Sequence, residues 1–324
     1  MRAVQPARGR ALLPGLALGP LLALLGIAGC DAPECAAGDY GRAECRVVAE
    51  NEVARLLSSD GHELRFQEPG AQNADSWEAL GLVDELDGGL RARPSGLADF
   101  ALSWAAGSPG TQELLLDNLA PGLRLSLGPL GAEEELAPGG RGLTRTLSVD
   151  AAEGEALWLR GRRDCPTNYR LAVLGDIQTN PLQFERILAR LHDEATVAEA
   201  AGEPLMGLIL VGDLTESSAA EEFDRIAELL RQSPVPVATT TGNHDIYDDQ
   251  TALYNQSLGP GNHAFTVCRT RVVLLDTGNG DLAPSVEARL PELLDRQGAD
   301  FLVVGSHYPP YADRTDQGFG DEAQ

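Results

Sequence analysis

The chain has 324 residues, of which 43% are apolar and 5% are aromatic. It is therefore long enough for two domains and can form a hydrophobic core, which excludes a fibrous or wholly disordered protein. The formal net charge of -24 comes from 49 acidic and 25 basic residues, and a surface of that sign repels nucleic acid. We expect no charge-driven nucleic-acid partner, and the sequence predicts no particular oligomeric state.

The N-terminus has the layout of an export signal, with an Arg-rich start, an apolar middle and small residues before Cys30. The ending "IAGC" is similar to the lipobox of bacterial lipoproteins, in which the Cys receives lipid. The alternative is an ordinary signal peptide with an incidental Cys. We expect residues 1–30 to be a signal peptide with a lipobox-like end. The exported protein would then be lipid-anchored to a bacterial cell membrane, on its periplasmic or cell-surface side.

Four further cysteines follow, namely Cys35, Cys45, Cys165 and Cys268. An even number of cysteines in an exported protein indicates two disulfides, and four cysteines allow three pairings. Cys35 and Cys45 flank a short stretch, so we expect them to pair and to leave Cys165 with Cys268. A zinc site is disfavoured because the four lack the close paired spacing of zinc ligands.

Residues 31–165 are expected to form a β-rich, sandwich-like domain. Short apolar segments such as "LRFQ", "LRLSLG" and "EALWLRG" are separated by Gly, Pro and acidic turns, without a sustained helical stripe. We expect a short helix near residues 52–58 and a surface position for His62.

Residues 166–324 have a different pattern and predict an α/β fold. Apolar strands such as "YRLAVLG", "MGLILVG" and "DFLVVGS" alternate with helical segments at 181–201 and 285–297. A third helix is expected in "SAAEEFDRIAELLRQ", opened by a Ser cap at Ser218.

Ligand-type side chains follow each buried strand of this second region. The four strand ends read Gly175-Asp176-Ile177-Gln178, Gly212-Asp213, Gly242-Asn243-His244-Asp245 and Ser306-His307. A single Gly-Asp is more often a turn than a site. In α/β sheets, however, ligands bind outside the carboxyl ends of strands, so four such endings indicate one shared site.

The motifs "GDIQ", "VGDLTE", "TGNHDIY" and "GSHYPPY" resemble those of the calcineurin-like metallophosphoesterase superfamily, over about residues 168–311. The resemblance implies a layered α/β/β/α fold, here C-terminally incomplete. It also implies hydrolysis of a phosphate mono- or diester by a metal-bridging hydroxide, with two divalent metal ions (Mn, Fe, Zn or Mg) as cofactors and a phosphoester as substrate.

The resemblance also implies a role for each matching residue. Asp213 would bridge the two metals, Asp176 and Gln178 would bind the first, and Asn243 and His307 would bind the second. His244 would stabilise or protonate the leaving oxygen, and Asp245 would orient the His244 ring.

The sequence departs from the family pattern at two places. Gln178 stands where most relatives have His, which favours oxygen-preferring ions such as Mn²⁺, Mg²⁺ or Ca²⁺. No G-H-x-H follows His307, so we expect the sequence to be truncated before the last His motif. The alternative is a non-catalytic binding lipoprotein that keeps the fold but not the full metal site. A purely structural cell-surface protein conflicts with the intact G-N-H-D.

Overall fold

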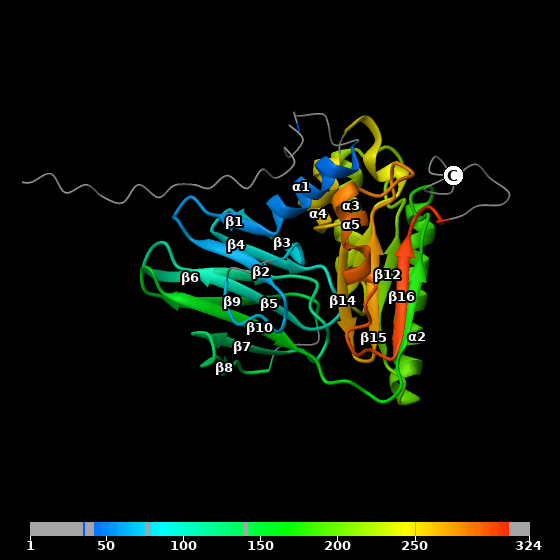
Figure 1. Cartoon of the computed structure of the whole chain (residues 1–324). Coiled ribbons are helices and arrows are strands. Elements are labelled where there is room, and N and C mark those ends of the chain that lie inside the picture. Colours follow the sequence, from blue (N-terminus) through cyan, green and yellow to red (C-terminus); the bar gives the residue numbers. More distant parts are fainter. Residues whose placement is uncertain (1–34, 36–41, 75–77, 139–141, 250, 311–324) are drawn as a thin grey trace, which may run out of the picture. The chain divides into compact units, whose positions relative to one another are not determined.

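The computed structural model describes residues 35, 42–74, 78–138, 142–249 and 251–310. The expected signal peptide and Cys30 lie outside these described residues. Residue contacts group Cys35–Gln324 into one compact unit of mixed α/β structure with four sheets among its described residues (Figure 1).

The first two sheets are made from strands between residues 55 and 162, and they share one hydrophobic core that includes Phe66, Trp104 and Leu159. One sheet has the order β1-β2-β5-β10-β7-β8 and the other β3-β4-β6-β9. The strands are β1 (Arg55–Leu57), β2 (Glu63–Gln67), β3 (Gly81–Leu86), β4 (Gly89–Pro94), β5 (Phe100–Ala105), β6 (Gly110–Leu116), β7 (Arg124–Gly128), β8 (Glu134–Glu135), β9 (Arg145–Ala151) and β10 (Ala156–Arg162).

Two local expectations for this region are wrong. We expected a helix at residues 52–58, but the helix of this segment is α1, Ala43–Val53. It ends at Val53 because the following residues, Arg55–Leu57, pair with β2 as a strand. His62 is only 1% exposed rather than on the surface. Its Nδ1 accepts hydrogen bonds from Trp104 Nε1 at 3.3 Å and from the Gly107 N–H at 3.1 Å. These two donors satisfy the buried ring nitrogen, which makes burial of a histidine possible.

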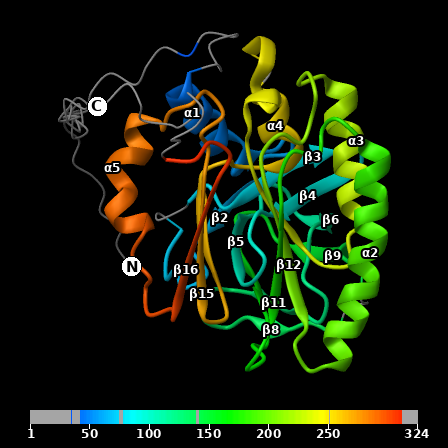
Figure 2. The ribbon, with the colours of Figure 1, turned by 90° about the vertical axis from the view of Figure 1, so that its right-hand side faces the viewer.

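The third sheet is parallel, with the order β11-β12-β13, and helices α2 and α3 pack against it (Figure 2). α2 begins where expected, with Pro181 in its first turn and the Asn180 side chain accepting from the Gln183 N–H. The elements are β11 (Arg170–Leu174), α2 (Pro181–Ala200), β12 (Leu205–Val211), α3 (Ala220–Arg231) and β13 (Val237–Thr240).

Ser218 does not cap α3, contrary to expectation. The N-cap residue is Ala219, and the Glu222 carboxylate accepts from the backbone N–H groups of Ser217 and Ala219. The Ser218 hydroxyl instead donates to the His244 carbonyl at 2.7 Å, so it stabilises the loop that carries the G-N-H-D motif.

The fourth sheet has the order β14-β15-β16, with β14 antiparallel and β16 parallel to β15. A core that includes Met206, Ile209 and Phe265 joins it to the third sheet, and a separate core with Ala43 and Val286 joins it to α1 and α5. The elements are η2 (Asn243–Asp249), α4 (Thr251–Leu258), β14 (His263–Val267), β15 (Thr270–Leu275), α5 (Pro284–Leu293) and β16 (Phe301–Ser306).

Both expected disulfides are present, Cys35–Cys45 and Cys165–Cys268. Disulfides persist in oxidising compartments, so these two bridges fit an extracellular protein. Among the helices that the structure describes, none has the length and apolar character needed to cross a membrane.

Candidate metal centre

Three of the expected ligands converge from the ends of three strands. Asp176 follows β11, Asp213 follows β12 and His307 follows β16. One ligand atom from each lies within 4.8 Å of the others, the one such group found among the described residues. Two carboxylates and an imidazole at this spacing can bind one divalent cation.

The backbone at this site adopts conformations that are unusual for residues with a side chain. Asp176 and Asp213 both have φ of 55°, in the left-handed region. Gly212 has φ of 88°, and a Cβ there would lie 2.6 Å from the Gly242 nitrogen and 2.8 Å from the His307 Cβ. The two loops approach so closely that only glycine fits at 212. Such strained conformations cluster at functional sites.

The tautomer of His307 follows from its hydrogen bonds. Its Nδ1 lies 3.2 Å from the Val211 carbonyl, which can only accept, so Nδ1 carries the proton. The Nε2 lone pair then faces Asn243 Oδ1 at 3.1 Å and Asp213 Oδ2 at 3.5 Å. In this tautomer the Nε2 lone pair and the Asn243 and Asp213 oxygens are all acceptors, an arrangement that a bound cation would stabilise. A ligating histidine commonly donates its other N–H to a carbonyl in this way.

Gln178 lies beside the same carboxylate. Its amide Nε2 donates to Asp213 Oδ2 at 3.2 Å, while its buried Oε1 has no hydrogen-bond partner among the described residues. A turn of the nearly symmetric amide would direct this oxygen to the cluster as a further ligand. The donors of this site therefore fit a divalent cation, with oxygen ligands in the majority.

The His244 ring is not part of the three-residue group, although the His244 backbone N–H donates to Asp213 Oδ1 at 3.0 Å. Its Nδ1 lies 2.8 Å from the Glu216 carbonyl and so carries the proton, which leaves Nε2 to accept from the Tyr247 hydroxyl at 3.2 Å. The Tyr247 oxygen in turn accepts from Asn243 Nδ2 at 3.2 Å. A chain of hydrogen bonds thus connects a candidate metal ligand with the His244 ring.

Asp245 contacts backbone groups of two loops, whereas we expected a contact with the His244 ring. Its carboxylate accepts from the backbone N–H groups of Leu214, Thr215 and Gly242, each at 2.9 Å. Burial raises the pKa of Asp245 to about 6. The side chain therefore connects the loop after β12 with the loop after β13. The partners of the His244 ring are Glu216 and Tyr247 instead.

Tyr247 and the Glu216 carbonyl were not among the expected site groups. A signal for Tyr247 exists in the sequence, because side chains three residues apart eclipse each other in a 3₁₀-helix, and His244 and Tyr247 share η2. Their ring centroids lie 4.7 Å apart. The Glu216 contact has no local signal, because it is made by a backbone atom of another loop.

In α/β sheets, ligands bind outside the carboxyl ends of the strands, and here these ends present carboxylate, amide and imidazole groups. The sequence of residues 169–323 matches the family of calcineurin-like phosphoesterases. The C-terminal half of the chain therefore belongs to the calcineurin-like phosphoesterase family. No curated protein sequence matches the chain.

Comparison with solved structures gives low similarity. A family two carbohydrate esterase from Clostridium thermocellum in complex with cellohexaose is 8% identical, with a TM-score of 0.15, over 76% of this chain and 90% of that one. A putative GDSL-like lipase from Bacteroides ovatus is 14% identical, with a TM-score of 0.15, over 68% of this chain and 78% of that one. A β-glucosidase from Kluyveromyces marxianus is 10% identical, with a TM-score of 0.12, over 78% of this chain and 33% of that one. With TM-scores this low, these matches bear on neither fold nor function.

Proposed function

We propose that this chain is a metal-dependent phosphoesterase that hydrolyses a phosphate mono- or diester. The observation that carries the proposal is the convergence of Asp176, Asp213 and His307, with their ligand atoms within 4.8 Å of one another, inside a calcineurin-like phosphoesterase domain. Membership of the family supports phosphoester hydrolysis as the reaction class. The convergence of the three side chains supports this position as the metal site.

Five side chains would hold two divalent cations in this proposal. Asp176 and Gln178 would hold the first, Asn243 and His307 would hold the second, and Asp213 would be shared between the two. When bound, such ions offset the charge of a phosphoryl group and make water a better nucleophile. The amide and carboxylate oxygens favour Mn²⁺ or Mg²⁺ over Zn²⁺ and Fe²⁺.

In this proposal, His244 transfers a proton through its Nε2 atom. With Nδ1–H donating to the Glu216 carbonyl, the ring is fixed and Nε2 is the nitrogen free to exchange a proton with the leaving oxygen. The Tyr247 hydroxyl donates to this Nε2 and so helps to keep the ring in place.

We also propose the domain boundaries expected from the sequence, with a β-rich domain at 31–165 and a phosphoesterase domain at 166–324. The order of the hydrophobic cores, from α2 and α3 through two sheets to α5, supports a layered α/β/β/α arrangement for the second domain. The two disulfides support export, and lipid attachment at Cys30 completes the proposal.

The test is metal content together with Mn²⁺-dependent hydrolysis of p-nitrophenyl phosphate and bis(p-nitrophenyl) phosphate. Asp213→Asn removes the central carboxylate charge while keeping the shape, and we expect it to lose bound metal and turnover together. Asp193→Asn, at an exposed position of α2, is the matched control and should change neither. Wild-type protein that binds metal but turns over neither ester would reject the proposal in favour of a non-catalytic binding protein.

A further inference from the structure

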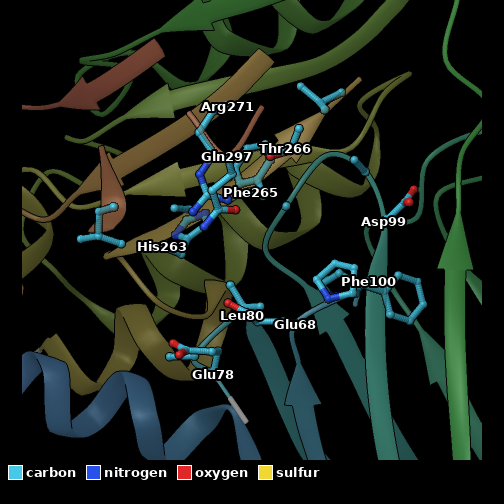
Figure 3. Close-up of a pocket in the computed structure, with 18 of the residues that line it drawn as sticks. Glu68, Glu78, Leu80, Asp99, Phe100, His263, Phe265, Thr266, Arg271 and Gln297 are labelled. Atoms are coloured by element: carbon cyan, nitrogen blue, oxygen red, sulfur yellow. The ribbon is translucent and has the colours of Figure 1, made fainter. Parts of the chain in front are cut away.

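A cleft of about 520 Å³ lies along strand β14, and none of the candidate metal ligands lines it. Its size falls within the roughly 300–1,000 Å³ of ordinary ligand sites. Figure 3 shows His263, Phe265 and Arg271 on one side, Asp99 and Phe100 on another, and Glu78 and Leu80 below. Nothing in the proposed hydrolysis uses this cleft.

The cleft follows the free edge of a sheet. β14 is the terminal strand of the order β14-β15-β16, so one of its two edges has no neighbouring strand in that sheet. All seven consecutive residues from Asn262 to Cys268 line the cleft, and residues 67–70 and 78–80 form the opposite wall. A pocket for a compact ligand would contact a few separate residues, whereas this one runs along an entire strand.

The register identifies which backbone groups face the cleft. Val267 pairs with Thr270 across a two-residue turn, so this pair exchanges both ladder hydrogen bonds with β15. Hydrogen-bonded and non-hydrogen-bonded pairs alternate along an antiparallel ladder. The N–H and C=O groups of Ala264 and Thr266 therefore point away from β15 and toward the cleft. They form a row that can pair with another strand.

The wall of the cleft also contains a buried hydrogen-bond acceptor, the side-chain oxygen of Gln67. Gln67 is fully buried, and its amide N–H groups donate to the Ala74 carbonyl and to the Ser103 hydroxyl. Its Oε1 has no hydrogen-bond partner among the described residues. This oxygen has less than 1 Å² of exposed surface, so the Gln67 side chain would have to rotate before an N–H group of an occupant could reach it.

The charges around the cleft disfavour an acidic occupant. The guanidinium groups in the lining are those of Arg163, Arg271 and Arg289. That of Arg289 pairs with Glu78 and Glu292, that of Arg163 donates to two backbone carbonyls, and that of Arg271 interacts electrostatically with Glu68 and Glu292. The carboxylates of Glu68 and Asp99 also lie in the lining. Together with the net charge of -24, these groups favour a basic partner.

We propose that this cleft binds an extended peptide segment of a partner protein, which adds to β14 as a further strand and carries basic side chains. Backbone hydrogen bonds to Ala264 and Thr266 would supply affinity, as in other cases of strand addition. Apolar side chains of the peptide would pack on Phe100 and Phe265, and alternate basic side chains would face Glu68.

The experiment measures binding of a fluorescent, acetylated Val-Lys-Val-Lys-Val amide to the mature chain by anisotropy. Thr266→Pro removes one outward N–H group without removing a ladder hydrogen bond to β15, so the sheet should stay intact. We expect this variant to weaken binding at least tenfold. Thr266→Ala keeps the N–H group and is the matched control, which should bind like the wild type.

Two further probes separate strand addition from other binding modes. The same peptide methylated at alternate backbone nitrogens should lose binding to the wild-type chain, and this result does not depend on any variant folding. A Val-Glu-Val-Glu-Val amide should bind more weakly than the lysine peptide. Absence of binding by the lysine peptide at millimolar concentration would overturn the proposal. So would equal binding of the methylated and unmethylated peptides.

Discussion

The carboxylate of Asp213 and the imidazole of His307 lie 3.5 Å apart, although they follow strands of two different sheets. Asp213 follows β12 of the third sheet, and His307 follows β16 of the fourth. The contact therefore depends on how the two sheets pack through the core that includes Ile209 and Val272. Neither sheet alone would form the cluster.

The first prediction concerns His244. In metal-loaded enzyme, His244→Ala should reduce turnover by roughly 10²–10⁴, the usual range for a positioned acid or base. Metal content should change little, because the ring nitrogens contact the Glu216 carbonyl and the Tyr247 hydroxyl. Asn243→Ala should instead lose metal. Equal metal loss in both variants would contradict the separate roles.

Tyr247→Phe changes the surroundings of the His244 ring less than His244→Ala does. It removes the hydroxyl that connects Asn243 with His244 and leaves the tilted contact between the two rings in place. Loss of one hydrogen bond of about 1 kcal/mol predicts a decrease in turnover of about fivefold, with bound metal retained. A decrease as large as that of His244→Ala would mean that Tyr247 itself takes part in proton transfer.

A third prediction uses two glycines with similar backbone angles. Gly212 and Gly202 both have positive φ, at 88° and 73°, so an alanine at either position is strained by about 1–2 kcal/mol. At Gly202 the added Cβ meets nothing within 4 Å, whereas at Gly212 it would lie 2.8 Å from the His307 Cβ.

Gly212→Ala should therefore cost a further amount of about 1–3 kcal/mol for overpacking and should also weaken metal binding, because His307 must move. Gly202→Ala should lower the melting temperature without altering metal affinity. Chemical denaturation and metal titration of both variants provide the measurements. Equal metal affinity in the two variants would show that the close approach of the loops does not hold His307 in place.

Much of the phosphoesterase region could be predicted from sequence, because its strands are short apolar runs and its polar residues follow them directly. The parallel arrangement brings those polar residues to one edge, so the strand ends alone predict that Asp176 and Asp213 lie together. For these two residues, the local sequence pattern and spacing were sufficient to predict the arrangement.

Other features depend on contacts between distant residues, which local pattern does not encode. Arg46 of α1 donates to the Asp276 carboxylate, 230 residues away, and this buried pair lies at the end of β15. The carboxylate of Asp245 could bond a neighbouring ring or three backbone N–H groups, and only the packing of two loops selects the second. The short strand at Arg55–Leu57 similarly depends on its pairing with β2.

A fourth prediction concerns the N-terminus. If Cys30 carries lipid, Cys30→Ser should move the protein from the membrane fraction to the soluble fraction, because no acyl chain would then anchor it. Ala28→Ser, which keeps the Cys and a small residue before it, serves as the control and should stay with the membrane. Mass spectrometry of the mature protein gives the decisive result. A mature chain without acyl groups that begins elsewhere would contradict the lipobox interpretation.

The last prediction concerns Glu50, a buried residue of α1. Its Oε1 accepts hydrogen bonds from the backbone N–H groups of Gly261 and Asn262, both at 2.9 Å. Burial, with the nearby Asp276 carboxylate, raises the pKa of Glu50 to about 8 from the ordinary value of 4.5. The folded state therefore binds a proton that the unfolded state has released between these two pH values.

The contribution of this proton to stability is complete below about pH 4.5 and is lost as the pH rises through about 8. Within this window the free energy of unfolding should fall with pH by up to about 1.4 kcal/mol per unit. Glu50→Gln keeps the accepting oxygen but has no proton to lose, so the variant should gain stability relative to the wild type from pH 5 to pH 8. Glu52→Gln, at an exposed position of the same helix, should follow the wild type. Urea denaturation across this pH range tests the difference, and parallel curves for wild type and Glu50→Gln would show that Glu50 is ionised in the folded protein.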